Sequence, residues 1–384
     1  MELRVGGIPH HIKILVLGAP MPADVPIMIE WHLDAMLSSV AVAQRVASVV
    51  TAMPLDKPGS INVHLYVETG MTRLGVMPDE VGTTLDAFHG AGARVNLVGF
   101  CTHFAEADDP ESDYTTRQLA AFRTALERVR SHPMFQEAKI DVHVSNSAAL
   151  LDAQVHELIR GFESAYVRPG IALYGFYPEI ASVPNDVASH WSAGEPMSSA
   201  HLGEGRRVWV RGLELHPSIK GQLEEALTLT AKVTNIIEVE AGTSVGYSRT
   251  WRAPTKCRIA TLGCGYADGY PRGASNKAKV AIRGHWFPIV GNVCMDMTMV
   301  SLGDDGGAGA AVEVGDEAIL FGRGGITASE LAHHCGTIHY EILTGVQKRV
   351  ARVYDNETPV REERALGVTK SEYAIASLLH EETQ

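Results

Sequence analysis

The stretch that decides the fold is INVHLYVETGMTRLG, residues 61–75. Its first seven residues are rich in Val, Ile and Leu, as a parallel strand buried on both faces requires. The same character recurs at 12–17 (IKILVL), 37–42 (LSSVAV), 95–101 (VNLVGFC), 139–145 (KIDVHVS) and 165–174 (AYVRPGIALY). Helical patterns lie between these stretches at 79–91 and 114–131. This alternation predicts βαβ architecture around a parallel sheet.

Polar residues follow the predicted strands at the point where each strand ends. They are Glu68 to Arg73, Thr102-His103, Asn146-Ser147 and, near the last strand, Arg168 to Ile171. Active sites lie at the carboxyl ends of strands in both parallel barrels and doubly wound sheets. The lack of a GxGxxG turn favours the barrel. A closed barrel needs eight strands and six are counted, so we predict an N-terminally incomplete (β/α)8-type barrel.

The second half of the chain has a different rhythm. Residues 179–222 are rich in Pro, Ser, His and Gly, which predicts an exposed insertion or linker. From residue 226 short β runs alternate with Gly turns, and one helix is expected at 327–335. We therefore predict four parts: a partial barrel at 1–178, the insertion at 179–222, a β-rich domain at 223–356 and a peripheral tail at 357–384.

Composition excludes several classes of protein. The 384 residues are 45% hydrophobic and 20% charged, which is typical of a globular protein with two domains. The net charge of -12, without a basic stripe, argues against nucleic acid as a partner. Apolar runs are shorter than the roughly 18 residues that a membrane span needs. Five cysteines without a CxxC pair indicate a reducing compartment, and we expect a cytoplasmic protein.

Single residues leave alternatives open. The Asn146-Ser147 pair and the Arg168–Ile171 turn stand where barrels commonly bind phosphate, but an N-cap at Ser147 and a plain Gly turn are equally compatible with the pattern. Arg168, expected within an apolar strand, requires a partner or a ligand, and it could share a network with His103. Arg73 is compatible with carboxylate binding or with an ordinary surface arginine.

Loop residues of the second half are weaker signals by themselves. Tyr247 and Tyr266 lie in Gly-rich turns, where functional residues concentrate, and Cys294-Met295-Asp296 reads as a strand end. The pairs His10-His11 and His333-His334 lack a third ligand at metal spacing, so no metal site is predicted.

Eight motifs occur in an order that identifies a family. They are HLYVETGMTRLG (64–75), THFAEAD (102–108), HVSNSAALL (143–151), VRPGIALYG (167–175), SVGYSRTW (244–251), GCGYADGYPR (263–272), GNVCMDMTMV (291–300) and TIHYEILTGVQKRVARVY (337–354). Together, over residues 2–355, they resemble alanine racemase, a pyridoxal-phosphate enzyme with an amino-terminal barrel and a carboxyl-terminal β domain. The resemblance implies interconversion of L- and D-alanine by two-base proton transfer on a cofactor aldimine, which supplies D-alanine for peptidoglycan.

The resemblance also implies roles for the catalytic residues. Tyr247 matches the base that moves the α-proton of L-alanine, and it acts in the barrel of the partner subunit of a homodimer. Because a phenol with a pKa near ~10 is a poor base at neutral pH, its anion needs stabilisation, which the positions matching His103 and Arg168 supply. Arg168 would also face the pyridine nitrogen, to which a guanidinium cannot transfer its proton.

Binding residues are implied in the same way. Cofactor binding is expected at Asn146, Ser147, Arg168, Gly170, Ile171 and Tyr340. Substrate binding is expected at Arg73, Met295 and Tyr266, with Tyr266 and Tyr340 lining the route to the cofactor.

Two departures from the family pattern stand out. Tyr66 occupies a position where many members have a lysine, often carbamylated, that steadies the arginine matching Arg73. The family's cofactor lysine, in a motif like KANAYGHG, has no counterpart, so we expect a start upstream of Met1 and no racemisation by the 384 residues alone. The alternatives are a non-catalytic pyridoxal-phosphate-binding or regulatory homologue, or a racemase for serine or a broader range of amino acids.

Overall fold

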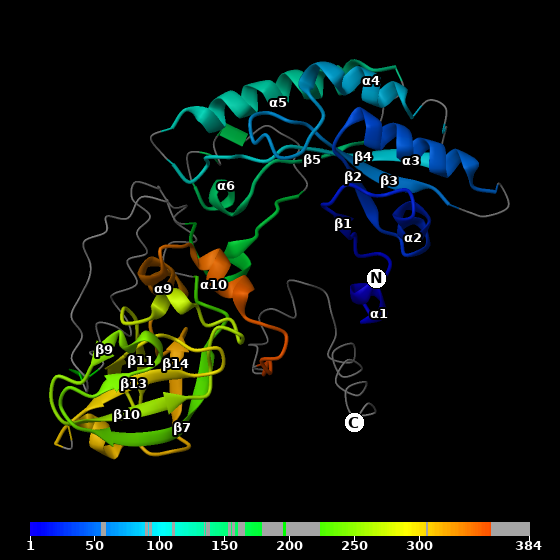
Figure 1. The fold of residues 1–384 in the computed structure, drawn as a ribbon. Coiled ribbons are helices and arrows are strands. Elements are labelled where there is room, and N and C mark those ends of the chain that lie inside the picture. Colours follow the sequence, from blue (N-terminus) through cyan, green and yellow to red (C-terminus); the bar gives the residue numbers. More distant parts are fainter. Residues whose placement is uncertain are drawn as a thin grey trace, which may run out of the picture. The chain divides into compact units, whose positions relative to one another are not determined.

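The computed structural model describes residues 1–54, 59–88, 91, 94–109, 112–133, 135, 139–152, 155, 158–159, 166–178, 195–196, 223–304 and 306–354. The chain divides into two compact units, one of Met1–Arg168 with the residues from Val353 onward, the other of Pro169–Arg352 (Figure 1). Except for 195–196, the predicted insertion at 179–222 and the predicted tail at 357–384 lie outside the described residues. None of the described helices has the length and apolar character needed to cross a membrane.

A five-stranded parallel sheet forms the centre of the first unit. Its strands, in spatial order, are β1 (Leu15–Val16), β2 (Asp34–Leu37), β3 (Ile61–Tyr66), β4 (Val95–Cys101) and β5 (Asp141–His143). Every neighbouring pair is parallel. Since sequential strands are neighbours and helices connect them, the sheet is barrel-like, and the predicted α/β class is confirmed.

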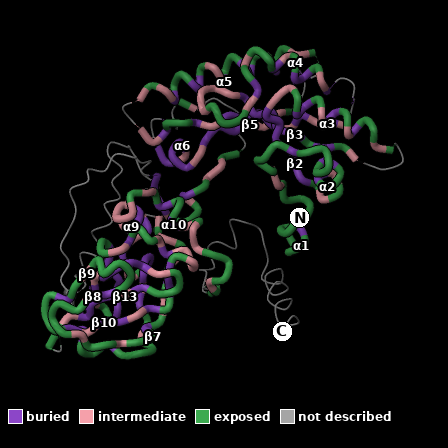
Figure 2. The backbone as a smooth tube through the Cα atoms, viewed as in Figure 1, coloured by how far each residue is buried: buried purple, intermediate pink, exposed green. Residues whose placement is uncertain are grey.

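Helices cover one face of this sheet. They are α2 (Asp24–Glu30), α3 (Val40–Ala52), α4 (Val81–Asp86), α5 (Tyr114–Ser131) and α6 (Ser147–Leu151). A further short helix, α1 (Glu2–Val5), begins the chain and contributes no residue to this apolar core. The predicted stripe of α5, including Leu119 and Phe122, belongs to the same buried apolar core as Val63 and Leu65 of β3. Figure 2 shows buried positions recurring along α5. The predicted helix at 114–131 is confirmed, whereas the one at 79–91 is shorter, a 3-10 turn (Pro78–Glu80) followed by α4.

Two predicted strands are wrong. The stretch 37–42 does not continue the strand, because the Ser39 side chain accepts a hydrogen bond from the Val42 amide at 3.2 Å and so caps α3. The stretch 165–174 contains no strand in its described part, and Arg168 lies on irregular backbone. Pro169 lacks the amide proton that a strand ladder needs, and Ile171–Tyr174 form a 3-10 turn instead.

The second unit is β-rich, as predicted. Its larger sheet has the spatial order β13-β10-β7-β14-β11-β12-β6, with antiparallel neighbours. The strands are β6 (Glu195–Pro196), β7 (Leu229–Val239), β10 (Cys257–Leu262), β11 (Lys279–Ile282), β12 (His285–Pro288), β13 (Thr298–Gly303) and β14 (Glu317–Phe321). A small ribbon joins β8 (Ser244–Val245) to β9 (Trp251–Arg252), and two helices follow, α9 (Ala328–Cys335) and α10 (His339–Gly345). Helix α9 confirms the prediction at 327–335.

One buried arginine organises the first residues of the chain. The guanidinium of Arg4 donates to the backbone carbonyls of Ile8, Pro9, Ile12, Trp31 and His32 at 2.5–3.3 Å. These carbonyls come from the segment after α1 and from the end of α2. Because the planar guanidinium presents five donors in a fixed fork, one side chain holds both segments beside β1 and β2.

Substituting Arg4 by lysine should therefore destabilise the first unit although the charge is kept. A lysine ammonium has three donors at one point and cannot reach carbonyls on two segments, so we expect a loss of about 2 kcal/mol in the free energy of unfolding. Urea titration followed by circular dichroism measures this loss. The matched control is Arg117→Lys in the exposed ion pair with Asp113, which should change stability by about 0.5 kcal/mol or less. Equal effects of the two substitutions would contradict the anchoring role of Arg4.

Candidate active site

The face of the parallel sheet opposite the helices carries buried polar side chains. Residues of a strand alternate between faces, so Val63 and Leu65 of β3 join the apolar core under the helices while His64 points to the other side. Asp34 of β2 and His143 of β5 hydrogen-bond to His64, which places them on the same face. The first unit therefore combines an apolar helical side with a polar side that ends at the carboxyl ends of β3, β4 and β5.

Arg168 lies at these carboxyl ends with its guanidinium enclosed by acceptors. It donates to the Thr102 carbonyl, to Nδ1 of His143 and, at 2.7 Å, to the His143 carbonyl. Its backbone amide donates to the Ser145 carbonyl at 2.9 Å. Burial lowers the pKa of Arg168, but a guanidinium still remains protonated at neutral pH. The loop after β5 thus carries a permanent, fixed positive charge.

His103 follows β4 and is held as a neutral base. Burial, assisted by the positive charges of Arg168 and Arg73, lowers its pKa to about 4. Its backbone carbonyl accepts from the Gln118 amide of α5 at 3.0 Å. The predicted network of His103 with Arg168 is therefore an electrostatic interaction. The side chain that hydrogen-bonds to the guanidinium is instead His143, which we did not single out from the sequence.

Tyr66, at the end of β3, has a buried hydroxyl group with no hydrogen-bond partner in the described part of the chain. Burial raises the pKa of this phenol, and the nearby Arg73 and Arg168 act in the opposite direction. A buried hydroxyl without a partner is costly. Tyr66 therefore offers a donor to a bound polar group between two cations.

Arg73 lies exposed on the loop that follows Tyr66. The Glu68 carboxylate folds this loop by accepting from the backbone amides of Gly70 and Thr72, the latter at 2.8 Å. The Tyr114 hydroxyl donates to the Gly70 carbonyl at 2.9 Å and ties the loop to α5. The Arg73 backbone is thus fixed while its side chain reaches solvent.

The Asn146-Ser147 pair begins α6, and the cap differs from the one considered in the sequence. Asn146, not Ser147, is the N-cap, since its Oδ1 accepts from the Ala149 amide at 3.0 Å. Its Nδ2 donates to the Phe104 carbonyl at 3.2 Å, which joins the loops after β4 and β5. Ser147 is the first residue of the helix, where the helix dipole favours an anion.

The lysines described in the first unit lie away from these residues. Lys13 donates to the Asp141 carboxylate at 3.1 Å and to the Tyr166 hydroxyl at 2.8 Å, at the amino end of β5. Lys139 stands two residues before the same strand. Both therefore belong to the opposite end of the sheet.

The other predicted residues lie in the second unit. Gly170 precedes the 3-10 turn that starts with buried Ile171. Tyr340 lies on α10 with its ring 4.7 Å from that of His339, which stacks on Phe176 at 5.1 Å. The stack links the segment of Ile171 with α10 inside this unit, so the residues expected to bind phosphate here share one local structure.

Tyr247 projects from a strained turn after β8. Gly246, Ser248 and Arg249 all have positive φ angles, of 71°, 61° and 52°. Such backbone persists where the surroundings determine it, and here the Asn292 side chain donates to the Tyr247 carbonyl at 2.9 Å. The Tyr247 side chain is 74% exposed. A rigid backbone thus presents a phenol outward.

Tyr266 and Met295 lie on two loops that are held against each other. The Tyr266 amide donates to the Cys294 carbonyl at 3.0 Å. The side chains of Tyr266 and Met295 are exposed. Arg349 donates to Asp268 at 2.8 Å and to Asp296 at 2.6 Å, one acceptor on each loop. Sequence reasoning missed Arg349, although it stands in the basic run of the last motif.

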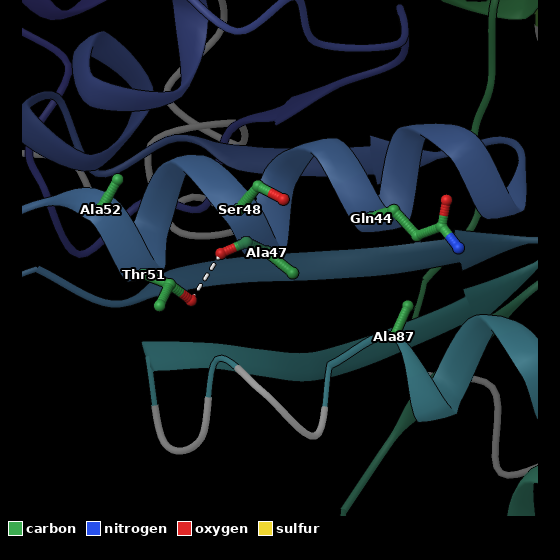
Figure 3. A pocket seen from close by; sticks show the side chains of 6 residues that line it. All are labelled: Gln44, Ala47, Ser48, Thr51, Ala52 and Ala87. Atoms are coloured by element: carbon green, nitrogen blue, oxygen red, sulfur yellow. Dashed lines mark hydrogen bonds between the residues drawn. The ribbon is translucent and has the colours of Figure 1, made fainter.

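Two hollows differ in their chemistry. One of about 510 Å³ in the second unit is lined by Tyr247, Cys294 and apolar residues such as Ile237 and Val239. The other, of about 470 Å³, lies beside α3 and is lined by Gln44, Ala47, Ser48, Thr51, Ala52 and Ala87 (Figure 3). It contains no titratable side chain and lies on the helical side of the sheet, so it is not the candidate site.

Comparison with known families matches both units. Residues 1–178 match the family model "Alanine racemase, N-terminal domain", and residues 226–354 match "Alanine racemase, C-terminal domain". A curated alanine racemase of Chlorobaculum tepidum is 34% identical over 341 residues, which cover 89% of this chain and 75% of that protein.

Solved structures agree. The alanine racemase of Bacillus anthracis with bound L-Ala-P is 30% identical, with a TM-score of 0.72 over 93% of this chain and 78% of that one. The alanine racemase of Bartonella henselae with covalently bound pyridoxal phosphate shares the fold at 24% identity, with a TM-score of 0.68 over 92% and 82% of the two chains.

The neutral state of His103 can be tested through its surroundings. Replacing the exposed Arg73 by glutamine removes one of the cations that oppose protonation, so the pKa of His103 should rise from about 4. Proton NMR titration of the imidazole measures the change. Arg130→Gln removes an exposed cation from the last turn of α5, at the other end of the helix from the Gln118 bond to His103, and should leave the titration unchanged. An unchanged His103 pKa in the Arg73 variant would show that the cation does not act on the imidazole.

Proposed function

The chain belongs to the alanine racemase family, so its reaction is the interconversion of L- and D-alanine with pyridoxal 5'-phosphate, and we propose how its residues divide this work. The observation that carries the proposal is the guanidinium of Arg168, fixed beside a neutral His103 at the carboxyl ends of the strands. Catalytic groups of parallel barrels lie at this end.

The described residues fit the cofactor. The Tyr66 hydroxyl is buried without a described partner, Arg168 is a fixed cation, and Ser147 begins a helix. We propose that Ser147, Gly170, Ile171 and Tyr340 bind the phosphate, that Asn146 shapes its loop, and that Arg168 faces the pyridine nitrogen. When bound, pyridoxal phosphate supplies an electron sink that makes the α-proton of alanine acidic.

We propose that Arg168 limits how much of the negative charge left by loss of the α-proton the pyridine ring of the cofactor would take up. Since its guanidinium donates hydrogen bonds without giving up a proton, Arg168 would leave a pyridine nitrogen placed against it unprotonated. This limits the charge that the ring accepts, which favours return of the proton to the same carbon over side reactions. His103 is neutral at physiological pH and keeps one N–H donor, which is able to donate a hydrogen bond to a phenolate and stabilise its charge.

Tyr247 is proposed as the base that moves the α-proton on the L side, at the barrel of a second copy. Its phenol is exposed on a backbone fixed by Asn292, as a side chain that serves another subunit requires. Arg73 and Met295 are proposed to contact the substrate carboxylate, and Tyr266 with Tyr340 to line the route inward. This role of Tyr247 would require a homodimer.

The physiological setting is also a proposal. All five cysteines are free thiols, which supports a reducing compartment such as the cytoplasm. There the product D-alanine would supply peptidoglycan. The proposed division into a barrel at 1–178, a linker or insertion at 179–222 and a β-rich domain at 223–356 is supported by the family matches to residues 1–178 and 226–354.

Removing the Tyr247 hydroxyl tests its role. In the protein expressed from its own gene, Tyr247→Phe should lower kcat for racemisation of L-alanine by about 10²–10⁴-fold, the usual contribution of a general base. Circular dichroism of the reaction mixture follows the loss of L-alanine. Tyr354→Phe removes another exposed phenol and should retain activity. Full activity in the Tyr247 variant would exclude it as the base.

The same assay separates the alternative functions. Racemisation of alanine but not of serine supports the proposal, whereas a higher rate with serine assigns a different substrate. A protein that binds the cofactor without racemising any amino acid would be a non-catalytic homologue.

Mixing two inactive variants tests whether subunits share a site. In a dimer of one Tyr247→Phe chain and one Arg168→Lys chain, one of the two sites keeps both native residues. Random exchange of subunits should therefore restore about a quarter of the native activity, as expected for a two-fold symmetric dimer with shared sites. No recovery after exchange, confirmed by mass spectrometry of mixed dimers, would place Tyr247 and Arg168 in the same subunit's site.

A further inference from the structure

A line of four polar side chains crosses the polar face of the parallel sheet. Arg168 donates to Nδ1 of His143, Nε2 of His143 lies 2.8 Å from Nδ1 of His64, and Nε2 of His64 lies 3.4 Å from the Asp34 carboxylate. Asp34, His64 and His143 are each no more than 5% exposed. The line thus runs from the candidate site across β4 to the inside of β2.

Glycine at position 99 makes this crossing possible. His64 is on β3 and His143 is on β5, so the contact passes over β4. A Cβ atom at Gly99 would lie 1.8 Å from Nδ1 of His64. Gly99 also stands at an irregularity in the pairing of β3 with β4. Backbone and side chain are therefore arranged to let the imidazole lie across the neighbouring strand.

The order of protons along the line follows from the guanidinium. Because arginine has donors and no acceptor, Nδ1 of His143 must accept, and its single proton stands on Nε2. That proton is donated to Nδ1 of His64, so the proton of His64 stands on its Nε2 and faces Asp34. A doubly protonated His64 would require His143 to accept at both nitrogens, which a neutral ring cannot do.

Burial supports this order. Desolvation, with the charge of Arg168 and the neighbouring His64, lowers the pKa of His143 to about 2, so the ring between the two partners is neutral. At the other end, the second oxygen of Asp34 accepts from Asn62 at 3.2 Å. The carboxylate thus ends the line as an acceptor with both oxygens used.

We propose that His64 and Asp34 are positioning residues that keep Nδ1 of His143 an acceptor and thereby fix the Arg168 guanidinium at the site. The catalytic consequence rests on the proposed function, in which Arg168 faces the cofactor ring, while the proton order does not. If His143 carried its proton on Nδ1 instead, it would oppose the guanidinium donor, and Arg168 would have to move. A displacement of about 1 Å at such a position costs up to 10²-fold in rate.

The proton order is measured directly by long-range ¹H–¹⁵N NMR on the full chain with labelled histidine. Both rings should show an unprotonated Nδ1 and a protonated Nε2, and neither should be doubly protonated at neutral pH. Loss of one set of signals in the His64→Gln variant assigns the rings. A proton on Nδ1 of either ring would overturn the proposal.

Two substitutions of His64 separate positioning from a general effect on stability. Glutamine offers an amide oxygen to His143 and an amide donor to Asp34, so His143 should keep one tautomer and kcat should stay within about twofold of the native value. Leucine offers neither, so His143 should populate both tautomers and kcat should fall about 10- to 100-fold. A single tautomer with full kcat in the leucine variant would overturn the positioning role.

A second Asp–His pair supplies the matched control. Asp86 of α4 contacts His132 at 3.2 Å on the helical side of the sheet, away from Arg168. Asp86→Asn should change neither the tautomers nor kcat. If the native rings show the predicted protons but the natural protein does not racemise alanine, the proposed function fails while the proton order stands. A change of the His143 tautomer in the Asp86 variant would contradict the claim that this tautomer depends on His64 and Asp34.

Discussion

A guanidinium that never releases its proton is the constraint on which the first unit depends. Arg168 can only donate, so its described hydrogen-bond partners must accept: the carbonyls of Thr102, His143 and Val144 and one nitrogen of the His143 ring. These acceptors come from the ends of β4 and β5, which brings the two loops of the site into one arrangement. The same positive charge disfavours protonation of His103. One side chain thus sets the position and the charge state of its neighbours.

In the second unit the candidate side chains are exposed, and the backbone that carries them is held in place. Tyr247, Tyr266 and Met295 are exposed, so packing cannot hold them. The backbone is fixed instead. Asn292 binds the strained turn of Tyr247, and Arg349 joins the loops of Tyr266 and Met295 through two carboxylates. Each exposed side chain therefore starts from a defined Cα position, which limits the entropy lost when it meets a partner.

Local pattern predicted much of this structure, and interactions over a distance determined the rest. Long apolar runs and the stripe of α5 are properties of neighbouring residues, and these elements were predicted correctly. The strand expected at 37–42 ends early because a serine side chain competes for a backbone amide, and the one at 165–174 is prevented by Pro169. The contact of His64 with His143 depends on sheet register and on Gly99, and neither is visible in a linear pattern. The sequence signal that could have indicated this contact is a histidine within each of two predicted apolar strands, His64 and His143.

Tyr66 stands where many members of the family have a lysine, and this difference affects the charges at the site. A phenol kept neutral by burial stands near Arg73 and Arg168, and it brings no negative charge to them. The nearby Glu68 carboxylate is already bound to two backbone amides. The charges that act on the His103 imidazole are those of Arg168 and Arg73, so the field at this position is positive. A positive field has two consequences here. It keeps His103 neutral, and it stabilises an anion that enters, such as a phosphate, a carboxylate or a phenolate. Replacing a charged partner of Arg73 by a phenol makes anion binding and a neutral His103 consequences of the same two arginines.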